Sequence, residues 1–334
     1  VDTGGHMNIP SAGISDVERI EMQYPFLYLT RGHNCDGSGF GRYRGGLGSY
    51  RIYLVYGSKD CTVDYKPYGG VAQGGFGLFG GYPTGRGVLR AVVQSDLGIL
   101  EQLRQGEFPD RRSIYEERWG PVTHPPGVPE RVSLPEGSLL IDYVSGGGGF
   151  GDPLDRKPEA VLKDTRRGWV SQDSAERVYG VRLNQEGTRV DDDATSELRK
   201  EIRQSRLREG KPPSGKTSSS EQEVSPNAQV LYKFHALLEI VGEKNGTVIR
   251  CSRCGHCFCS GRDNYKLYAL RRVISLEDFM PYSLPSGEPF VGEFHEYYCP
   301  GCAAQLQVDL YCPPMGGEPI LWDSHLHLSS GSER

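Results

Sequence analysis

The sequence predicts an α+β protein with a glycine-rich, β-dominated domain and a helical tail, then a linker and a small β-rich domain. Three observations lead to this prediction. Thirty of the 45 glycines lie in residues 1–151, and glycine at this density suits tight turns and close backbone packing. Strand-like patterns give way to helix-like patterns after residue 153. Seven of the nine cysteines lie between residues 251 and 312, which marks a separate unit.

Four short segments of the first part are predicted as strands because they are rich in aromatic and β-branched residues. They cover residues 24–29, 50–56, 88–93 and 138–144. The last of them runs into four consecutive glycines, Gly146 to Gly149. The pattern predicts short strands joined by many turns.

The helical tail begins near Pro158, a residue that suits the first position of a helix, and Gly168 is expected to end this first helix. Ser171 is expected to cap a second short helix, and residues 181–190 are expected to form a small hairpin. A charged helix is predicted from about residue 195 to 208. Its acidic and basic residues recur at helical spacing, which is typical of a solvated face.

Residues 209–226 are dominated by serine, proline, glycine and charge, so they cannot bury a core and are predicted as a linker. The predicted organisation is therefore a domain over residues 1–208, a flexible linker over 209–228 and a domain over 229–334.

The linker contains a match to the phosphate-binding pattern G-x-x-x-x-G-K-[ST], from Gly210 to Thr217. A working phosphate loop needs a strand before it and a helix after it. Here a charged helix precedes the match, and Pro212 with Pro213 removes two N–H donors. We therefore reject a nucleotide site in this segment.

The formal net charge is −5, whereas proteins that bind nucleic acid or membrane surfaces are usually basic. No apolar run approaches the length of about 18 residues that a spanning helix needs, and no signal peptide is visible. An odd number of clustered cysteines argues against a secreted disulfide framework. We expect a cytoplasmic protein with no nucleic-acid or membrane partner.

Two C-x-x-C pairs predict a metal site. Cys251 and Cys254 form the first pair, Cys299 and Cys302 form the second, and 44 residues separate them. Each tight turn places two thiolates on one side, and two such turns complete a tetrahedral four-sulfur site of the zinc-ribbon type. Four thiolates leave no open coordination position, so the expected zinc is structural.

Other ligand sets remain open at this point. His256 or Cys257 can replace one thiolate, because both lie close to the first pair. Cys312 follows a strand-like segment and is expected to be a small buried side chain. His325 and His327 lie two residues apart and can bind metal, although a polar tail is the favoured interpretation. Acidic residues near the second pair argue against binding of nucleic acid by this domain. They are Glu288, Glu293, Glu296, Asp309 and Glu318.

Several runs of the first domain resemble the C-terminal part of the hydantoinase B/oxoprolinase family. The resemblance extends from about residue 15 to residue 207. It rests on an entry from Glu18 to Pro25, the run GRYRGGLG at residues 41–48, the run GGGGFGDP at 146–153, and the segments 168–171 and 179–181. The last domain, with its two cysteine pairs and the run EYYCPGC at 296–302, resembles the small zinc-binding gamma subunit of acetone and acetophenone carboxylases. Those enzymes also contain a hydantoinase-B-like subunit.

The resemblance implies a subunit, or a split part of a subunit, of a multi-subunit, biotin-independent, ATP-dependent carboxylase of the acetone/acetophenone carboxylase type. Such a ligase joins bicarbonate to a ketone-like substrate. It implies two partners, a hydantoinase-A-like ATPase subunit and a chain that carries the N-terminal hydantoinase-B-like part. ATP and a second divalent metal are expected on those partners, and the isolated chain is expected to be inactive.

The resemblance covers only about the last third of a B-type subunit, and the family's metal-binding motifs lie upstream of it. No catalytic residue of the family can therefore be assigned to this chain. His6, His33 and His124 are candidates by residue type alone, and a structural role is favoured for each. The glycine runs, with Arg42 and Arg44, either face an anion or serve tight turns and close packing, and packing is favoured.

Two other functions remain. One is a subunit of an ATP-dependent hydantoinase/oxoprolinase-type amidohydrolase, which is the hydrolytic branch of the family. The other is a non-catalytic assembly module stabilised by zinc. The gamma-like domain favours the carboxylase, because the hydrolytic branch typically lacks it.

Overall fold

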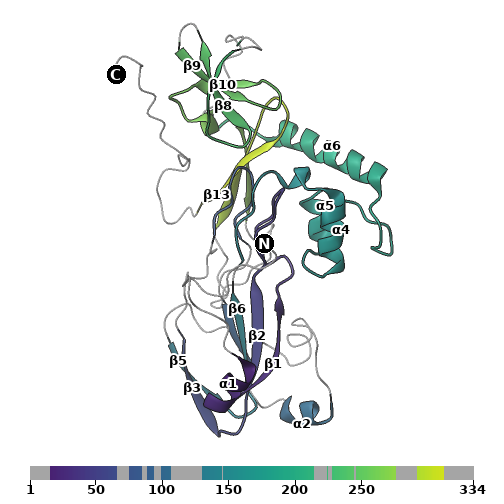
Figure 1. The fold of residues 1–334 in the computed structure, drawn as a ribbon, viewed down its shortest axis with the longest axis vertical. Coiled ribbons are helices and arrows are strands. Elements are labelled where there is room, and N and C mark those ends of the chain that lie inside the picture. Colours follow the sequence, from purple (N-terminus) through teal and green to yellow (C-terminus); the bar gives the residue numbers. More distant parts are fainter. Residues whose placement is uncertain are drawn as a thin grey trace.

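The computed structural model describes residues 16–65, 75–84, 89–93, 99–106, 130–144, 146–213, 224, 228–243, 246–275 and 292–311. These residues form helices and mostly small antiparallel sheets, so the α+β prediction is confirmed. The molecule is elongated, with sheets towards both ends and extended segments between them (Figure 1). Among the described helices, none is both long enough and apolar enough to cross a bilayer.

The first sheet contains the strands predicted near residues 24–29, 50–56, 88–93 and 138–144. In spatial order they are β1 (Phe26–His33), β2 (Ser49–Val55), β6 (Leu139–Val144) and β4 (Leu89–Val93). Every neighbouring pair is antiparallel. Buried side chains of β2 and β6, with Leu103, form the core on one face of the sheet; the strand residues are Tyr50, Ile52, Leu54, Leu139 and Ile141.

Smaller elements surround this sheet. Two further strands pair with each other, and two short helices lie nearby (Figure 1). The strands are β3 (Asp60–Tyr65) and β5 (Glu130–Pro135), and the helices are α1 (Val17–Gln23) and α2 (Ile99–Arg104). Buried Val55, Leu134 and Leu140 form a second small core between the β3–β5 pair and the first sheet.

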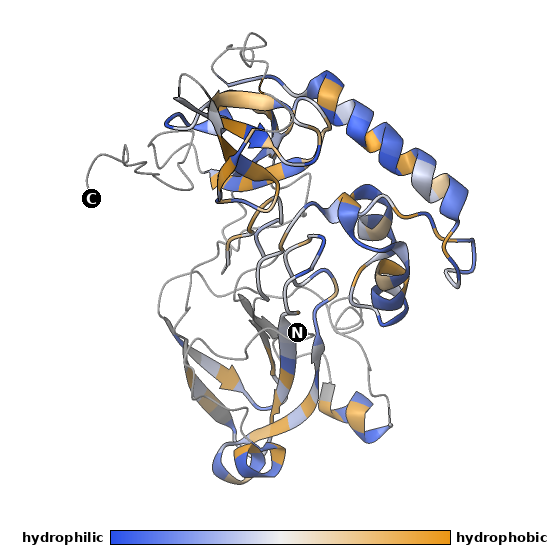
Figure 2. Cartoon of the chain, turned by 45° about the horizontal axis from the view of Figure 1, so that its top comes forward, coloured by the Kyte–Doolittle hydropathy of each residue, from blue (hydrophilic) through white to orange (hydrophobic). Residues whose placement is uncertain are grey.

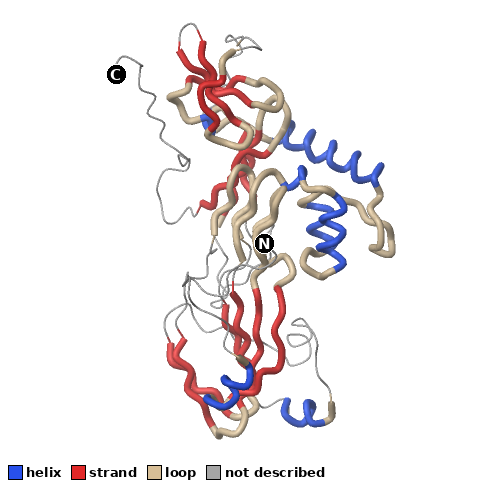
Figure 3. The backbone as a smooth tube through the Cα atoms, viewed as in Figure 1, coloured by secondary structure: helices blue, strands red, loops and turns tan. Residues whose placement is uncertain are grey.

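Three glycine-rich segments, residues 37–48, 75–84 and 146–151, lie against one another and are called here the glycine stack. They are the extended loop segments, drawn tan, between the first sheet and the upper part of the molecule (Figure 3). Phe150 is bridged to Tyr43 on one side, by N–O distances of 3.0 and 2.8 Å, and to Leu78 on the other. The three segments thus form a hydrogen-bonded ladder of backbone.

Glycine is required in the stack because the backbones approach too closely for side chains. A Cβ added to Gly149 would lie 2.0 Å from the carbonyl oxygen of Phe40, and one added to Gly45 would lie 2.0 Å from that of Gly147. Some of the N–H groups are also occupied: those of Gly39 and Gly147 donate to backbone carbonyls at 2.8 Å. The structure therefore supports packing, rather than anion binding, as the role of these runs.

The helical tail follows the stack and agrees with the sequence at its starts and stops. Pro158 begins its first α-helix, and the side chain of Ser171 caps the next by accepting from the N–H of Ser174 at 3.0 Å. Gly168 has φ of 68°, which suits a helix stop. The predicted hairpin at 181–190 is a single bridge between Leu183 and Val190. The elements are η2 (Pro153–Asp155), α4 (Pro158–Arg166), α5 (Gln172–Arg177) and α6 (Asp192–Glu209).

Helix α6 begins a few residues before its predicted start, and it also buries one charged side chain. Its colouring is mainly hydrophilic (Figure 2), and Lys200 lies 3.6 Å from Glu197 on an exposed face, as expected. Arg206, however, is only 3% exposed. The charged pattern predicted a solvated face of the helix, but it did not identify Arg206 as a buried residue.

The described residues from 16 to 213 are called here the first half, and those from 228 to 311, called the second half, contain two antiparallel sheets. Four of its strands form one sheet, in the order β10 (Cys257–Ser260), β9 (Gly246–Cys251), β8 (Leu238–Glu243) and β7 (Val230–Lys233). The other sheet contains β11 (Leu270–Ser275), β12 (Glu293–Tyr298) and β13 (Gln305–Tyr311), and η3 (Tyr265–Leu267) lies between the two in sequence. Lys211, in the expected linker, exchanges two backbone hydrogen bonds of 3.0 Å with Arg271 of β11, which is an edge strand of this sheet.

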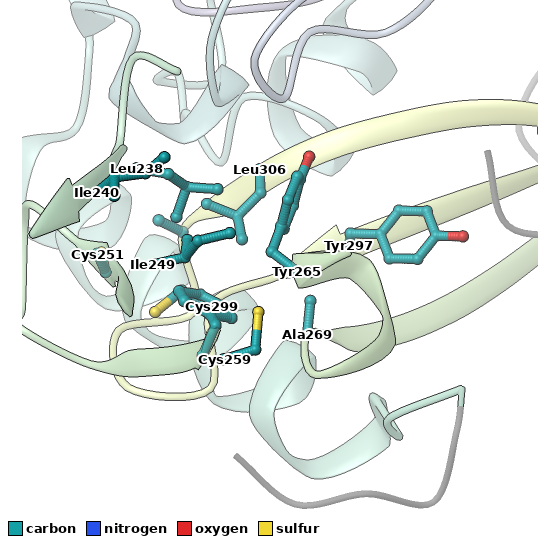
Figure 4. Close-up of a cluster of buried hydrophobic side chains, with 12 residues drawn as sticks. Leu238, Ile240, Ile249, Cys251, Cys259, Tyr265, Ala269, Tyr297, Cys299 and Leu306 are labelled. Atoms are coloured by element: carbon teal, nitrogen blue, oxygen red, sulfur yellow. The ribbon is translucent and has the colours of Figure 1, made fainter. Parts of the chain in front are cut away.

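Two cores hold this half in place. The first joins its two sheets and includes Leu238, Ile249, Cys299 and Leu306, which lie close together in Figure 4. The second core is shared with the first half of the chain: Phe294 and Val308 pack in one buried cluster with side chains of the glycine stack and the helical tail. Those partners are Phe40, Tyr82, Val161, Val170, Ala175, Tyr179 and Val181.

Candidate metal centre

The two cysteine pairs meet in space. The sulfur atoms of Cys251, Cys254, Cys299 and Cys302 all lie within 4.8 Å of one another. Cys251 and Cys302 are 4.0 Å apart at sulfur, and Cys254 and Cys299 are 3.6 Å apart. Four sulfurs around a zinc ion, each about 2.3 Å from it, would stand about 3.8 Å apart. The cluster therefore has the geometry to hold a metal ion such as zinc.

Each pair sits in a turn with the same backbone hydrogen bonds. In the first turn, the N–H of Gly255 donates to the carbonyl of Cys251 at 2.9 Å. In the second, the N–H of Ala303 donates to the carbonyl of Cys299 at 2.8 Å. Gly255 has φ of 79°, as its place at the turn exit predicts, and Ala303 has φ of 57°. The two turns are built alike, although only one has the glycine that this backbone geometry favours.

Contacts among the thiols shift their pKa values. The side chains of Cys299 and Cys302 hydrogen-bond to Cys251 and lower its pKa to about 4. The same contact with Cys251 raises the pKa of Cys299. A thiolate that forms readily is what metal binding needs, because the thiolate is the ligand.

The other candidate ligands lie apart or cannot be placed. Among the residues that the structure describes, only the four cysteines form a group with metal-binding geometry, and neither His256 nor Cys257 belongs to it. Burial lowers the pKa of His256, which favours its neutral form. Cys312, His325 and His327 lie outside the described residues.

A buried ionic cluster lies beneath the second cysteine turn. Arg206 contacts Asp152 through two N–O pairs, at 2.8 and 3.2 Å, and also donates to the carbonyl of Ala303 at 3.1 Å. Gln305 completes the cluster: its N–H donates to Asp152 at 2.9 Å, and its side chain accepts from Arg206 at 3.1 Å. Burial alone would raise the pKa of Asp152, but Arg206, with the N–H groups of Gln305 and Leu154, holds it below its usual value.

The first cysteine turn also reaches the helical tail. Arg253, which lies between Cys251 and Cys254, forms an ion pair with Asp155 just after the glycine stack. Asp155 also lies 3.4 Å from Arg203 of α6. Both cysteine turns therefore contact the same short stretch of the first half, residues 152–155.

Glu296, on β12, anchors a third set of contacts. It accepts hydrogen bonds from the hydroxyls of Tyr82 and Tyr298, and from Arg272 at 3.0 Å. Burial raises the pKa of both tyrosines well above the usual value, so they remain protonated donors. Since Tyr82 belongs to the glycine stack, Glu296 joins the two halves of the chain.

The acidic residues expected around the second cysteine turn lie in different environments. Glu296 and Asp309 are buried, and Asp309 pairs with the buried Lys266 at 2.8 Å. Glu293 lies 3.1 Å from His295, while Glu288 and Glu318 are outside the described residues. At least part of this acidity is internal and does not form an acidic surface.

Arg44 and His33, two of the candidates in the first half, both lie against the ring of Trp169. Arg44 pairs with Asp164 at 2.9 Å, and Arg42 is exposed beside the ring of Tyr43. His33 contacts the ring of Trp169 at a centroid distance of 6.1 Å. His6 and His124 lie outside the described residues.

Sequence reasoning missed the cluster of Asp152, Arg206 and Gln305. One signal was available: Asp152 comes directly after the glycine-rich segment at 146–151. Nothing in the sequence distinguishes Arg206 from the other arginines of α6, because its partners lie 54 and 99 positions away.

Sequence models of two families match the chain in separate places. The model described as hydantoinase B/oxoprolinase matches residues 1–153. The model described as acetone carboxylase gamma subunit matches residues 225–331, which include all four cysteines of the cluster.

Curated proteins that are similar to the chain include two carboxylase subunits. The acetone carboxylase alpha subunit of Xanthobacter autotrophicus is 32% identical over 214 residues, which are 61% of this chain and 27% of that protein. The acetophenone carboxylase delta subunit of Aromatoleum aromaticum is 28% identical over 207 residues, 59% of this chain and 29% of that protein. A nucleotide-free structure of acetone carboxylase superposes with a TM-score of 0.52 at 30% identity, covering 61% of this chain and 28% of the other.

The similarity is not confined to carboxylases. The beta subunit of caprolactamase from Pseudomonas jessenii is 31% identical over 180 residues, which are 54% of this chain and 27% of that protein. The chain thus spans less than a third of the length of each of these relatives.

Proposed function

Because the chain joins a hydantoinase B/oxoprolinase segment to an acetone carboxylase gamma-subunit segment, we propose that it is a subunit, or part of a subunit, of an ATP-dependent, biotin-independent carboxylase of the acetone/acetophenone type. The substrate is a ketone-like molecule, and bicarbonate supplies the carboxyl group. The complex includes a hydantoinase-A-like ATPase and a chain with the N-terminal hydantoinase-B-like part.

One observation carries this proposal: a gamma-subunit-like segment lies in the same chain as the hydantoinase-B-like segment, and the two share a buried core. The carboxylase subunits named above match 61% and 59% of the chain. The gamma-subunit-like segment favours carboxylation over hydrolysis.

Within such a complex, this chain has a structural task. Cys251, Cys254, Cys299 and Cys302 would hold one zinc ion, and four thiolates leave it no open position for substrate or water. The zinc would stabilise the second half of the chain. ATP binding and the divalent metal of the reaction are assigned to partner subunits.

The alternative is a subunit of a ring-opening amidohydrolase. It is favoured by the similarity to the caprolactamase subunit, which is as high as 31%. Under this alternative the complex would hydrolyse a lactam or hydantoin ring with ATP, and the gamma-like segment would serve assembly only.

The test is purification of the chain under native conditions from its source cells, through a tag on the chromosomal gene. We expect longer A-like and B-like chains to be identified in the eluate by mass spectrometry. The purified complex is then given ATP and labelled bicarbonate with acetone or acetophenone, and in parallel with hydantoin or caprolactam without bicarbonate.

Label fixed into an acid-stable carboxylate, dependent on ATP and ketone, supports the carboxylase. Ring opening without fixation of label supports the amidohydrolase. A stable, monodisperse monomer without partners would contradict both enzymatic proposals.

A further inference from the structure

The two halves of this chain meet at an interface that the cysteine cluster organises. We propose that this cluster acts as a metal-dependent latch: with metal bound, the second half stays docked on the first even when the chain between them is cut, and without metal it comes off. The proposal does not depend on which reaction the complex performs.

Several polar contacts across the interface involve residues within the cysteine pairs or just after them. Arg253 lies inside the first C-x-x-C pair and reaches Asp155. Ala303 and Gln305 follow the second pair directly and reach Arg206 and Asp152. Because metal binding fixes both turns, it also fixes the atoms that contact the first half.

Backbone complementarity adds a contact that tolerates little movement. The side chain of Gln305 donates to the carbonyl of Gly80 at 2.7 Å. A Cβ on Gly80 would lie 2.2 Å from the carbonyl oxygen of Gln305, so the glycine stack touches β13 at backbone distance. A small displacement of the second cysteine turn would break this fit.

Apolar and buried polar contacts supply the rest of the interface. The rings of Tyr82 and Phe294 are 5.8 Å apart, and Phe79 lies against His235 with centroids 4.6 Å apart. Glu296 is fully buried and binds Tyr82 across the same boundary. A joint that combines a shared apolar core with satisfied buried polar groups resembles a stable interface between subunits.

The described chain after α6 contacts the second half at Lys211, whose backbone pairs with that of Arg271. None of the contacts above involves residues 214–223. The interface therefore has its own set of interactions, independent of chain connectivity in that segment.

The experiment places a specific protease site between Ser218 and Ser219 of the full chain, with an affinity tag on the N-terminal side. The purified protein is cut after folding, and its zinc content is measured. The amount of C-terminal half retained by the tag is then compared before and after treatment with a chelator, with re-addition of Zn²⁺ as a further step.

We expect the C-terminal half to be retained in the metal-loaded protein and released after chelation. Release from the metal-loaded, zinc-verified protein would overturn the proposal, because the interface would then depend on the covalent link. Retention after verified removal of the metal would also overturn it, because the cluster would then not control docking.

A variant with all four cysteines intact tests the interface itself, separately from any unfolding of the metal-free second half. Gln305→Ala removes a buried partner of Arg206 and Gly80, and is expected to weaken association of the cut halves about tenfold with zinc content unchanged. The matched control is Gln307→Ala, two residues further along the same strand, which should leave association unchanged. Equal retention by the two variants would contradict the assigned contacts.

Discussion

Arg206 of α6 and Asp152 at the end of the glycine stack form a two-point ion pair, with N–O distances of 2.8 and 3.2 Å, from which solvent is almost completely excluded. The cost of burying two charges is large, and such pairs often add little net stability. Removal of only one partner of such a pair is nevertheless costly, because the other charge then stays buried without its counterion. The pair therefore fixes the position of the second cysteine turn more than it strengthens the fold.

The first prediction concerns this pair. Arg206→Ala should lower the free energy of unfolding by about 3–5 kcal/mol, because Asp152 would remain buried without its cation. Lys200→Ala, on the exposed face of the same helix, should change it by less than about 0.5 kcal/mol. Chemical denaturation of both variants checks this, and similar values for the two would contradict the structural role of Arg206.

The second prediction is a pH dependence. The pKa of Asp152 is below its usual value, so its ionised form contributes stability that is fully present above the unfolded pKa of about 3.9. That contribution is lost as the pH falls through the folded pKa. Asp152→Asn lacks it, and its stability should fall less steeply than that of the wild type below about pH 4. Denaturation midpoints measured across acid pH give the comparison; parallel curves would refute the assignment.

The third prediction concerns the metal. Elemental analysis should find about one zinc per chain, and Cys251→Ser should abolish zinc binding and unfold the second half, because such sites couple metal binding to folding. Cys257→Ser removes a nearby thiol outside the cluster and should keep the zinc. Zinc that persists after loss of both Cys251 and Cys254 would disprove the ligand set.

The fourth prediction compares two neighbouring glycines. Gly149→Ala would place a methyl group 2.0 Å from the backbone of Phe40, whereas Gly147→Ala would place one no closer than 3.4 Å to its nearest neighbour. The first should cost about 3 kcal/mol or more through overpacking, and the second less than about 1 kcal/mol. Thermal unfolding of both variants decides; equal losses would mean that the stack is not as closely packed as described.

The fifth prediction compares equivalent positions in the two cysteine turns. Gly255→Ala should lose about 1 kcal/mol, because φ of 79° is unfavourable for alanine and no neighbouring atom lies within 4 Å of the added group. Ala303→Gly relieves the same strain in the second turn but frees the unfolded chain, so it should be near neutral. A large loss in Ala303→Gly, with zinc retained, would mean that its methyl group has a packing role.

Local features of the fold could be predicted from the sequence because their causes are local. Ser171 caps its helix, Gly168 and Gly255 take positive φ, and the four strands of the first sheet lie where aromatic and branched residues cluster. Helix α6 begins at Asp192, a few residues before the predicted start, because the side chain of Asp191 caps it by accepting from Ala194 at 3.0 Å. The turn that each cysteine pair forms was predictable for the same reason, since spacing within a pair is a local property.

Contacts between distant segments could not be predicted. Glu296 looked like one of several acidic residues near a cysteine pair, but Tyr82 lies 214 positions away and Arg272 binds it from another strand. Arg206 looked like any charged residue of a solvated helix. Periodicity reports which face of a helix is polar, but it does not report which polar side chain finds a buried partner.

The run Gly146 to Gly149 consists of four identical residues, so a shift by one position would exchange each residue for another of the same kind. Nothing within the run can tell one alignment from the next. The alignment must therefore be set at its end, where Phe150 is held between Tyr43 and Leu78 and Asp152 is clamped by Arg206. Asp152 therefore fixes the register of a stretch of backbone that has no side chains of its own to fix it.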